Sequence, residues 1–349
     1  MLTASLRFTF FPFSILTCVL LTVLHADEVP LIMGDWQGAY IDAPPKSYGF
    51  DNPSIVAQVV GVNGGAFHVK MMNAFERRAN LDFEKVLKPL DGIIQYKDKQ
   101  WEFELGPDGW KGKRTMKRGK GKVDELPFEL KRVVRISQTL RRKAPEGADV
   151  ILPADTLSGF EHGDGKPATW ELLPGGVLET FPRKEGNKSG GHLFTKNVYA
   201  DCEIHLEFKL PYEPEHSGQG RGNSGIFIQN AYEVQILDSY GFESGWTEAG
   251  SIYRVAPSKV NRSRPPGQWQ TYDITFRAAQ FDESGKLIQA PEITVYHNGE
   301  LIHKDQEIFE RSGFTELNRL KPHIQGPAPI LLQDHGHRIQ FRNFWVKSL

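Results

Sequence analysis

Acidic and amide side chains alternate with apolar ones in the stretch NSGIFIQNAYEVQILDSYG, residues 223–241. Successive side chains of a β-strand point to opposite faces, so Val234 and Ile236 share one face while Glu233 and Gln235 share the other. We expect the apolar pair to pack in a core. The polar pair is then expected to line a groove, in which a row of polar side chains can bind a sugar.

Two other segments carry groups that could act together with this pair. In ADCEIHLEFKL, Glu207 lies deep within its strand, on the face opposite the apolar residues that alternate with it. In PILLQDHGHRIQFRNFWVK, the residues Gln333, Asp334, His335 and His337 stand between two apolar strands. Histidines next to an aspartate and a turn can bind a metal or transfer protons, although this spacing is also typical of structural histidines.

The pair Glu233 and Asp238 invites comparison with glycosidases. These enzymes commonly use two carboxylates, about 5–5.5 Å apart in retaining and about 6.5–9.5 Å apart in inverting enzymes. The run EVQILD resembles the E-x-D-x-x-E arrangement of jelly-roll glucanases, in which the outer glutamates are nucleophile and acid. Here Gln235 replaces the middle aspartate and Asp238 replaces the second glutamate. This departure argues against ordinary retaining hydrolysis and keeps a glucanase-type glycoside hydrolase as an alternative.

Short strand patterns, separated by Gly, Pro and Asn turns, run through the whole chain and must position these groups. They predict an all-β protein, because no amphipathic helix pattern is convincing. A boundary is expected near residue 146, within RRKAPEGADVILPADTLSG. Residues 27–145 then form a small β domain. Residues 146–349, with many strands at regular spacing, are typical of a sandwich or jelly roll.

The first 26 residues are typical of a secretory signal peptide, with one arginine, an apolar run over 8–24 and a small residue at position 26. The mature chain is therefore expected to be secreted or periplasmic and not membrane-spanning, with a retained membrane anchor as the alternative. Since Cys18 leaves with the signal peptide, Cys202 has no disulfide partner and is expected to pack in a core.

The first domain is basic: residues 27–143 contain 21 Lys and Arg against 16 Asp and Glu, a net charge of +5. Much of this charge lies in WKGKRTMKRGKGK, residues 110–122. The run predicts either a solvated hairpin tip or a contact with a polyanion, such as a sulfated or uronic polysaccharide. Nucleic acid is excluded as a partner, because the protein is expected to be exported and the run lacks interleaved aromatic residues.

Several motifs of the second domain occur together and in one order: GHLFTKNVYADCEIHLEFKLP, GNSGIFIQNAYEVQILDSYG, GSIYRV, GQWQTYDITF, VYHNGELIHKD and LLQDHGHRIQFRNFWVK. As a set, over about residues 148–349, they resemble the 3-keto-disaccharide hydrolase family. The resemblance implies a concanavalin A-like jelly-roll β-sandwich, the fold of many lectins and glucanases. It also implies cleavage of glycosides already oxidised at C3, in which a base removes the C2 proton, the C1 substituent leaves and water adds to the product.

The implied chemistry needs one base, one acid and an electrophile at the enolate oxygen. Glu233 or His335 is then the base, with the other as the acid. The remaining candidates would contact substrate hydroxyls, the sugar ring or a divalent ion that polarises the ketone. They are Glu207, Gln235, Gln333 and Asp238 for hydroxyls or the ion, Asn223 as a hydrogen-bond donor, Tyr253 or Trp246 for ring stacking, and Arg342 for a carboxylate or hydroxyl.

Other interpretations stay open at this point. A non-catalytic carbohydrate-binding protein is one alternative, because sandwich folds host many lectins and a fold does not determine a function. A divalent ion could also be a purely structural Ca²⁺, although no loop has clear Asp-rich calcium spacing. For Arg342 a structural ion pair is an equal alternative, and for Trp246 packing on the sandwich rim.

Overall fold

The structure is a computed structural model that describes residues 28–41, 54–75, 81–118, 121–180 and 190–349. The expected signal peptide, residues 1–26, lies outside the described residues. The described chain is built almost entirely from β-strands, with a short α-helix, α1 (Glu316–Arg319), and a 3₁₀ turn, η2 (Gly218–Gly220), which confirms the all-β prediction.

Among the described residues, none of the helices combines the length and the apolar character that a membrane span requires.

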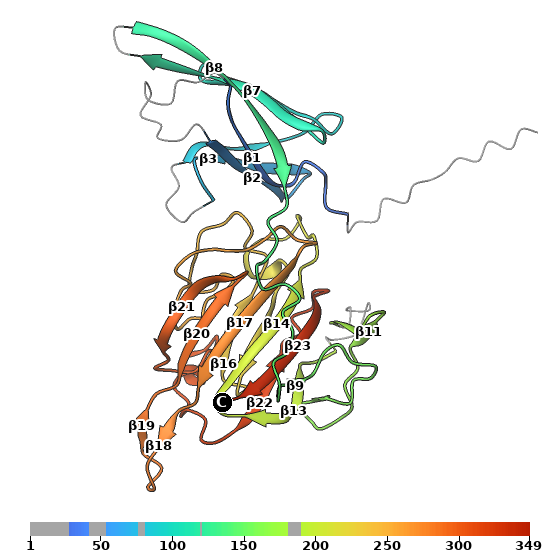
Figure 1. The fold of residues 1–349 in the computed structure, drawn as a ribbon, viewed down its shortest axis with the longest axis vertical. Coiled ribbons are helices and arrows are strands. Elements are labelled where there is room, and N and C mark those ends of the chain that lie inside the picture. Colours follow the sequence, from blue (N-terminus) through green and yellow to red (C-terminus); the bar gives the residue numbers. More distant parts are fainter. Residues whose placement is uncertain (1–27, 42–53, 76–80, 119–120, 181–189) are drawn as a thin grey trace, which may run out of the picture.

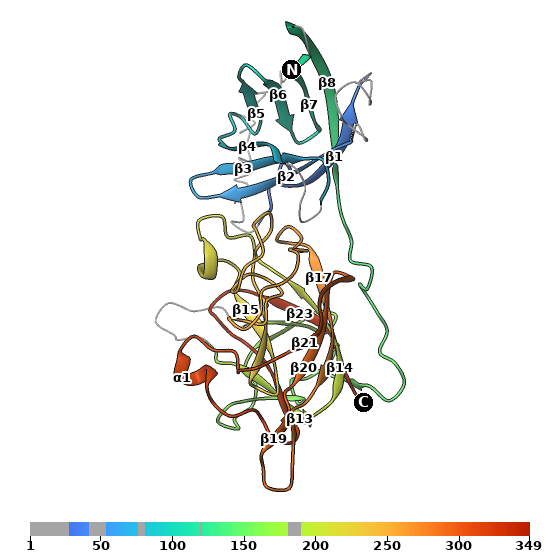
Figure 2. The same cartoon turned by 90° about the vertical axis from the view of Figure 1, so that its left-hand side faces the viewer.

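The first domain is an antiparallel sheet of eight strands in the order β4-β3-β2-β1-β8-β7-β6-β5. Its strands are β1 (Gly34–Tyr40), β2 (Ser54–Val62), β3 (Ala66–Met72), β4 (Leu81–Leu87), β5 (Ile94–Lys97), β6 (Trp101–Gly106), β7 (Gly109–Arg118) and β8 (Lys122–Val133). The sheet curls over an apolar core of its own (Figure 2). Alternation along β6 places Trp101, Phe103 and Leu105 in this core.

The second domain packs two antiparallel sheets face to face (Figure 1). The five-stranded sheet has the order β10-β13-β22-β15-β16, and the eight-stranded sheet has the order β11-β12-β23-β14-β17-β20-β21, with β9 beside β23. Val234 and Ile236 from one sheet and Leu206 and Phe208 from the other lie in the shared core. This arrangement confirms the expected concanavalin A-like sandwich.

The strands of the second domain are β9 (Asp149–Val150), β10 (Phe160–His162), β11 (Glu171–Leu173), β12 (Val177–Glu179), β13 (Leu193–Tyr199), β14 (Cys202–Lys209), β15 (Ser224–Ile228), β16 (Tyr232–Ile236), β17 (Trp269–Arg277), β20 (Glu292–His297), β21 (Glu300–Glu307), β22 (Ala328–Leu332) and β23 (Gln340–Ser348). A small separate hairpin is formed by β18 (Gln280–Phe281) and β19 (Leu287–Gln289).

A linker, residues 134–146, joins the domains and follows the outer face of the eight-stranded sheet of the second domain (Figure 2). Thr139 Oγ1 donates to Asp273 Oδ2 at 2.6 Å, and Arg142 Nη1 donates to Asp273 Oδ1 at 2.9 Å. Asp273 lies on β17, so the linker covers polar side chains that the sheet turns away from its core.

The loop that follows β16 holds the two domains together. Tyr240 is buried in the core of the first domain, and its hydroxyl donates to Asp35 Oδ1 on β1 at 2.9 Å. Lys70 Nζ on β3 donates to the carbonyl oxygen of Gly241 at 2.7 Å. The first domain therefore binds the chain through these contacts a few residues after β16, the strand that carries Glu233.

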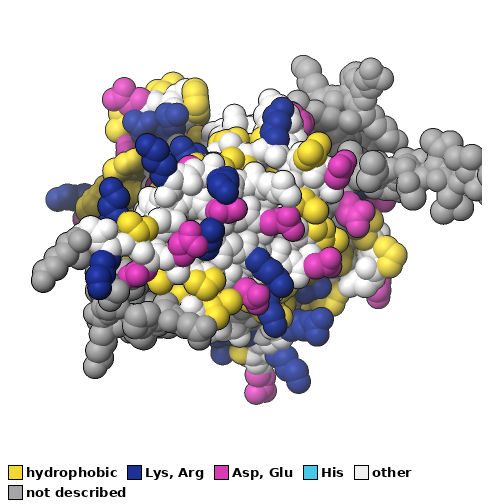
Figure 3. Space-filling view, turned by 90° about the horizontal axis from the view of Figure 1, so that it is seen from above, with side chains coloured by type: hydrophobic (Ala, Val, Ile, Leu, Met, Phe, Trp, Pro, Cys, Tyr) yellow, Lys and Arg dark blue, Asp and Glu magenta, His cyan; other side chains and the backbone are white. Residues whose placement is uncertain are grey.

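The basic run 110–122 forms most of β7 and the start of β8. Its lysines face acidic side chains of the neighbouring strands: Lys113 Nζ lies 3.1 Å from Glu125 and 3.5 Å from Glu102. Seen from the end of the molecule that this domain forms, Lys and Arg are interspersed with Asp and Glu (Figure 3). The pairing favours the solvated hairpin, and the polyanion contact stays a prediction.

Candidate active site

Three neighbouring strands bring polar residues into one row on the outer face of the five-stranded sheet. Gly225 of β15 pairs with Gln235 of β16, and the backbone N–H of Gln333, just after β22, donates to Gly225 O at 2.9 Å. Since Val234 and Ile236 point into the core, Gln235 points outward. Gln333 Oε1 is buried and has no hydrogen-bond partner among the described residues. The polar row formed by Gln235 and Gln333 therefore contains an acceptor atom, Gln333 Oε1, that makes no hydrogen bond within the described residues and lies next to the strand that carries Gly225.

The carboxyl group of Glu233 lies over Gly225. A Cβ atom built on Gly225 would come within 2.3 Å of Glu233 Oε1, so this carboxyl group occupies the space that the absent side chain of the glycine leaves. The Glu233 backbone is fixed on both sides, because its N–H donates to Ser312 Oγ at 2.9 Å and its carbonyl accepts from Tyr253 N at 3.0 Å. The backbone from which the carboxyl group projects is therefore held in place.

Burial sets the protonation state of Glu233. The residue is only 4% exposed, and its desolvation raises the pKa of the carboxyl group to about 8. A carboxyl group with such a pKa is mostly protonated at neutral pH and can donate a proton. A strongly shifted carboxyl group next to polar side chains is typical of a catalytic site.

An amide cluster continues the row. Asn223 Nδ2 donates to the carbonyl oxygen of Gln219 at 2.7 Å, and Gln235 Nε2 lies 3.1 Å from Gln219 Oε1. In the reverse orientation of the Gln235 amide, its nitrogen donates to Glu233 Oε1 at 3.0 Å instead. Amide groups at this position can offer both donors and acceptors to sugar hydroxyls.

Histidines gather at the turn that follows Gln333. His337 Nδ1 lies 2.7 Å from Glu213 Oε2, and the rings of His335 and His337 stack with their centroids 6.3 Å apart. Burial opposes the ionisation of Glu213, but the hydrogen bonds from His337 and from Gly222 N–H outweigh it and lower the pKa of Glu213. An ionised Glu213 can therefore hold the His337 ring in its orientation through this contact.

The described residues were also expected to hold a divalent ion. Among them, no group of three or more His, Cys, Asp or Glu side chains is placed so that it could bind a metal ion. A divalent ion held with the help of amide oxygens therefore stays a prediction.

Glu207 and Arg342 lie on the opposite sheet, so the expected place of Glu207 beside Glu233 is corrected. Arg342 Nε lies 2.7 Å from Glu207 Oε2, and the linker N–H of Arg141 donates to Oε1. Burial opposes ionisation of Glu207, but His205, 3.6 Å away, and these hydrogen bonds outweigh it and lower its pKa to about 2. Glu207 anchors the linker, and Arg342 has the structural ion pair that was its alternative role.

Asp238 is also placed differently from expectation. Its side chain is buried, and Oδ2 accepts a hydrogen bond from Arg221 Nε at 2.6 Å. Arg221 Nη1 in turn donates to the carbonyl oxygen of Gly61 in the first domain at 2.9 Å. The carboxylate therefore supports the domain interface, and it is not available as a second catalytic carboxylate.

The two aromatic candidates lie in the segment that runs along the edge of β16. Tyr253 follows Ile252, which bridges to Val234, and its N–H donates to Glu233 O. Trp246 is 58% exposed, and its carbonyl accepts from the backbone of Arg254. Tyr253 is therefore adjacent to Glu233, whereas the indole of Trp246 faces solvent.

Glu213, beside the histidine turn, and Gln219, in the amide cluster, were not expected from the sequence. Glu213 lies in the loop after β14, and Gln219 lies in η2. Neither position has a strand periodicity that would reveal the direction of its side chain. The Glu-x-x-His spacing of Glu213 and His216 is the one signal in the sequence, and this spacing is common.

Known proteins support the fold and place the chain in a family. Residues 147–347 match the model of the 3-keto-alpha-glucoside-1,2-lyase-like domain. A proposed glycosyl hydrolase from Parabacteroides distasonis ATCC 8503 is 35% identical, with a TM-score of 0.53, and the match covers 59% of this chain and 85% of that one. A second one from the same organism, at 18% identity, 58% and 95% coverage and a TM-score of 0.44, is too distant to carry an argument. No curated protein matches the chain.

The family match includes the polar row, Glu233 and the histidine turn, and the first domain lies outside it. This agrees with the resemblance seen in the motifs of the second domain. The chain therefore belongs to the family of 3-keto-alpha-glucoside-1,2-lyase-like domains, and it is a carbohydrate-active enzyme of the glycoside-cleaving class.

Proposed function

We propose that the protein cleaves glycosides that carry a ketone at C3, by removal of the C2 proton and elimination of the C1 substituent. The observation that carries this proposal is the buried Glu233 carboxyl group, whose pKa is raised to about 8 above a row of amides. The carboxylate nucleophile of a retaining glycosidase must be ionised. A carboxyl group that stays protonated at neutral pH is instead suited to protonate a leaving oxygen.

In this mechanism Glu233 is the acid and His335 is the base. His335 accepts the C2 proton, which the neighbouring C3 ketone makes acidic, and the electrons left on C2 delocalise onto the C3 oxygen. They then return to form the C1–C2 double bond as the C1–O bond breaks. Glu233 gives its proton to the departing oxygen. Water finally adds across the double bond, with its oxygen on C1 and a proton on C2, which yields the free 3-keto sugar.

The amides of Gln235 and Gln333 support the negative charge that develops on the C3 oxygen. Amide N–H groups already in place stabilise an enolate without reorganisation during the reaction. The buried Oε1 of Gln333, which has no partner among the described residues, is available for a substrate hydroxyl. Glu213 and His337 lie beside His335 and help to hold its ring in position.

We also propose that the mature enzyme is exported, because residues 1–26 have the composition of a signal peptide. Export would place it outside the cytoplasm, where its substrate would be a glycan or glycoside oxidised at C3 by another enzyme. The class of reaction that supplies the substrate is therefore the oxidation of a secondary sugar hydroxyl to a ketone.

The test is an incubation of the mature chain with a 3-keto-glucoside and with its unoxidised parent, each with and without a chelator. Release of the leaving group from the keto substrate alone is expected, and Glu233→Gln should abolish it while Glu203→Gln, a partly exposed carboxylate on β14, should not. Cleavage of the parent would favour a glucanase-type hydrolase. Sugar binding without turnover of either compound would favour a lectin. Loss of turnover on chelation would show that a metal takes part.

A further inference from the structure

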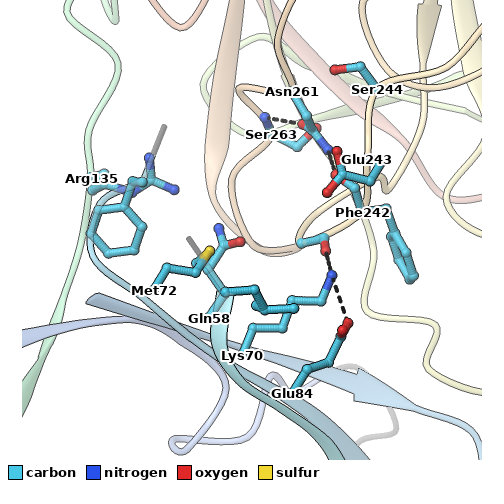
Figure 4. Close-up of a pocket in the computed structure, with 13 residues that line it drawn as sticks. Gln58, Lys70, Met72, Glu84, Arg135, Phe242, Glu243, Ser244, Asn261 and Ser263 are labelled. Atoms are coloured by element: carbon cyan, nitrogen blue, oxygen red, sulfur yellow. Dashed lines mark hydrogen bonds and ion pairs between the residues drawn. The ribbon is translucent and has the colours of Figure 1, made fainter. Parts of the chain in front are cut away.

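A cavity of about 300 Å³ lies between the two domains, away from the polar row. Figure 4 shows Gln58 and Lys70 of the first domain on one wall, and Phe242, Ser244 and Ser263 of the second domain on the other. This volume is at the lower end of the range of small-ligand pockets, ~300–1,000 Å³. None of the expected site residues lines it.

The cavity is close enough to the candidate active site for one extended ligand to contact both. Gly241, which lines the cavity, is six residues after Gln235. Six residues span at most about 20 Å, even in a fully extended chain. A glycan several sugar units long can cover this distance.

The cationic groups of the cavity are already neutralised. Lys70 Nζ lies 2.7 Å from Gly241 O and 3.5 Å from Glu84 Oε1. Arg135 Nε lies 2.8 Å from Asp35 Oδ2. A phosphate, sulfate or carboxylate would have to displace these partners, so the cavity does not favour an anionic ligand. An uncharged ligand does not have this cost.

Several polar groups of the second domain are available for such a ligand. Ser263 is 4% exposed, and its Oγ is buried with no hydrogen-bond partner among the described residues. Glu243 and Ser244 line the same cavity, and no hydrogen bond or ion pair joins either side chain to another described residue. Phe242 is 39% exposed and adds an aromatic ring. Hydroxyl and carboxylate groups beside an aromatic ring match the hydroxyls and the C–H face of a neutral sugar.

We propose that this interdomain cavity is a second carbohydrate subsite, which binds a neutral sugar residue of a longer glycan. The first domain then contributes to substrate selection by supplying one wall of the subsite. This inference deepens the proposed function by favouring long, neutral substrates. It rests on the carbohydrate-active character of the protein, and its binding test does not require elimination chemistry.

The test is isothermal titration calorimetry of the mature chain with maltose, maltohexaose, cellohexaose and a heparin hexasaccharide. At least one neutral hexasaccharide is expected to bind. Phe242→Ala should weaken this binding about five- to tenfold, and Glu243→Gln should also weaken it. Maltose binding should not change in either variant. The matched control is Phe309→Ala, because Phe309 is 72% exposed and does not line the cavity.

Unchanged hexasaccharide binding in both cavity variants would overturn the proposal, as would binding of the heparin fragment alone. Turnover of a short 3-keto-glucoside, measured on the same variants, separates this result from the proposed function. Turnover that persists without hexasaccharide binding contradicts the subsite only. Hexasaccharide binding that depends on Phe242, without turnover in the wild type, contradicts the elimination chemistry only.

Discussion

Replacement of Glu233 by glutamine is expected to stabilise the folded protein while it removes the proposed proton donor. The residue is 4% exposed, and burial raises its pKa to about 8. In the unfolded chain a glutamate titrates near pH ~4.3. Between these two values the folded protein binds more protons than the unfolded chain, so the stability of the wild type falls as the pH rises through this window.

The size of the effect follows from the separation of the two pKa values. Each pH unit between the two pKa values corresponds to ~1.36 kcal/mol. The rise from pH ~4.3 to pH 7 therefore lowers the free energy of unfolding of the wild type by up to about 3.7 kcal/mol. The loss would reach a ceiling of about 5 kcal/mol near pH 8 and then stay constant. Glutamine does not ionise and is not subject to this loss. The variant should therefore be about 2–3.5 kcal/mol more stable than the wild type at pH 7, after allowance for relaxation of the buried site.

Urea unfolding at several pH values between 4 and 8, followed by tryptophan fluorescence, measures this difference. The advantage of Glu233→Gln should be near zero at the acidic end and grow with pH, and Glu203→Gln serves as the control variant. The turnover of the wild type should also fall above pH ~8, because the acid is then ionised. An advantage that does not depend on pH, or a variant less stable than the wild type at pH 7, would show that Glu233 is ionised in the fold and would refute the reasoning.

Three further variants test the surroundings of this carboxyl group. Gly225→Ala places a Cβ atom within 2.3 Å of Glu233 Oε1, so kcat should fall at least tenfold while the circular dichroism spectrum is retained; unchanged kcat would contradict the proposed geometry. Glu213→Gln removes the carboxylate 2.7 Å from His337 Nδ1 that helps to position the histidine turn, so kcat for the 3-keto-glucoside should fall, and an unchanged kcat would contradict this positioning role. Tyr240→Phe removes a buried interdomain hydrogen bond and should lower the free energy of unfolding by about 1–2 kcal/mol. Proteolysis between the domains should then be faster than in the wild type, and an unchanged rate of proteolysis would contradict this prediction.

The sequence alone predicted the class of the fold because the relevant signals are local. Strand alternation and turn residues are read over a few positions, so the all-β character and the sandwich of the second domain were confirmed. The same alternation assigned Val234 and Ile236 to the core. It also assigned Glu233 and Gln235 to the opposite face of their strand, which is their position in the structure. Ordered motifs were enough to identify the family.

Only the tertiary structure decided which polar faces lie together. Alternation says that Glu207 and Glu233 point away from the core, but not that β14 and β16 belong to different sheets, with their outer faces on opposite sides of the sandwich. Likewise, the ion pair of Asp238 with Arg221 and the covering of Glu207 by the linker depend on long-range contacts. The protonation of Glu233 is decided in the same way, because a pKa depends on what the whole fold packs around a group and not on its neighbours in the chain.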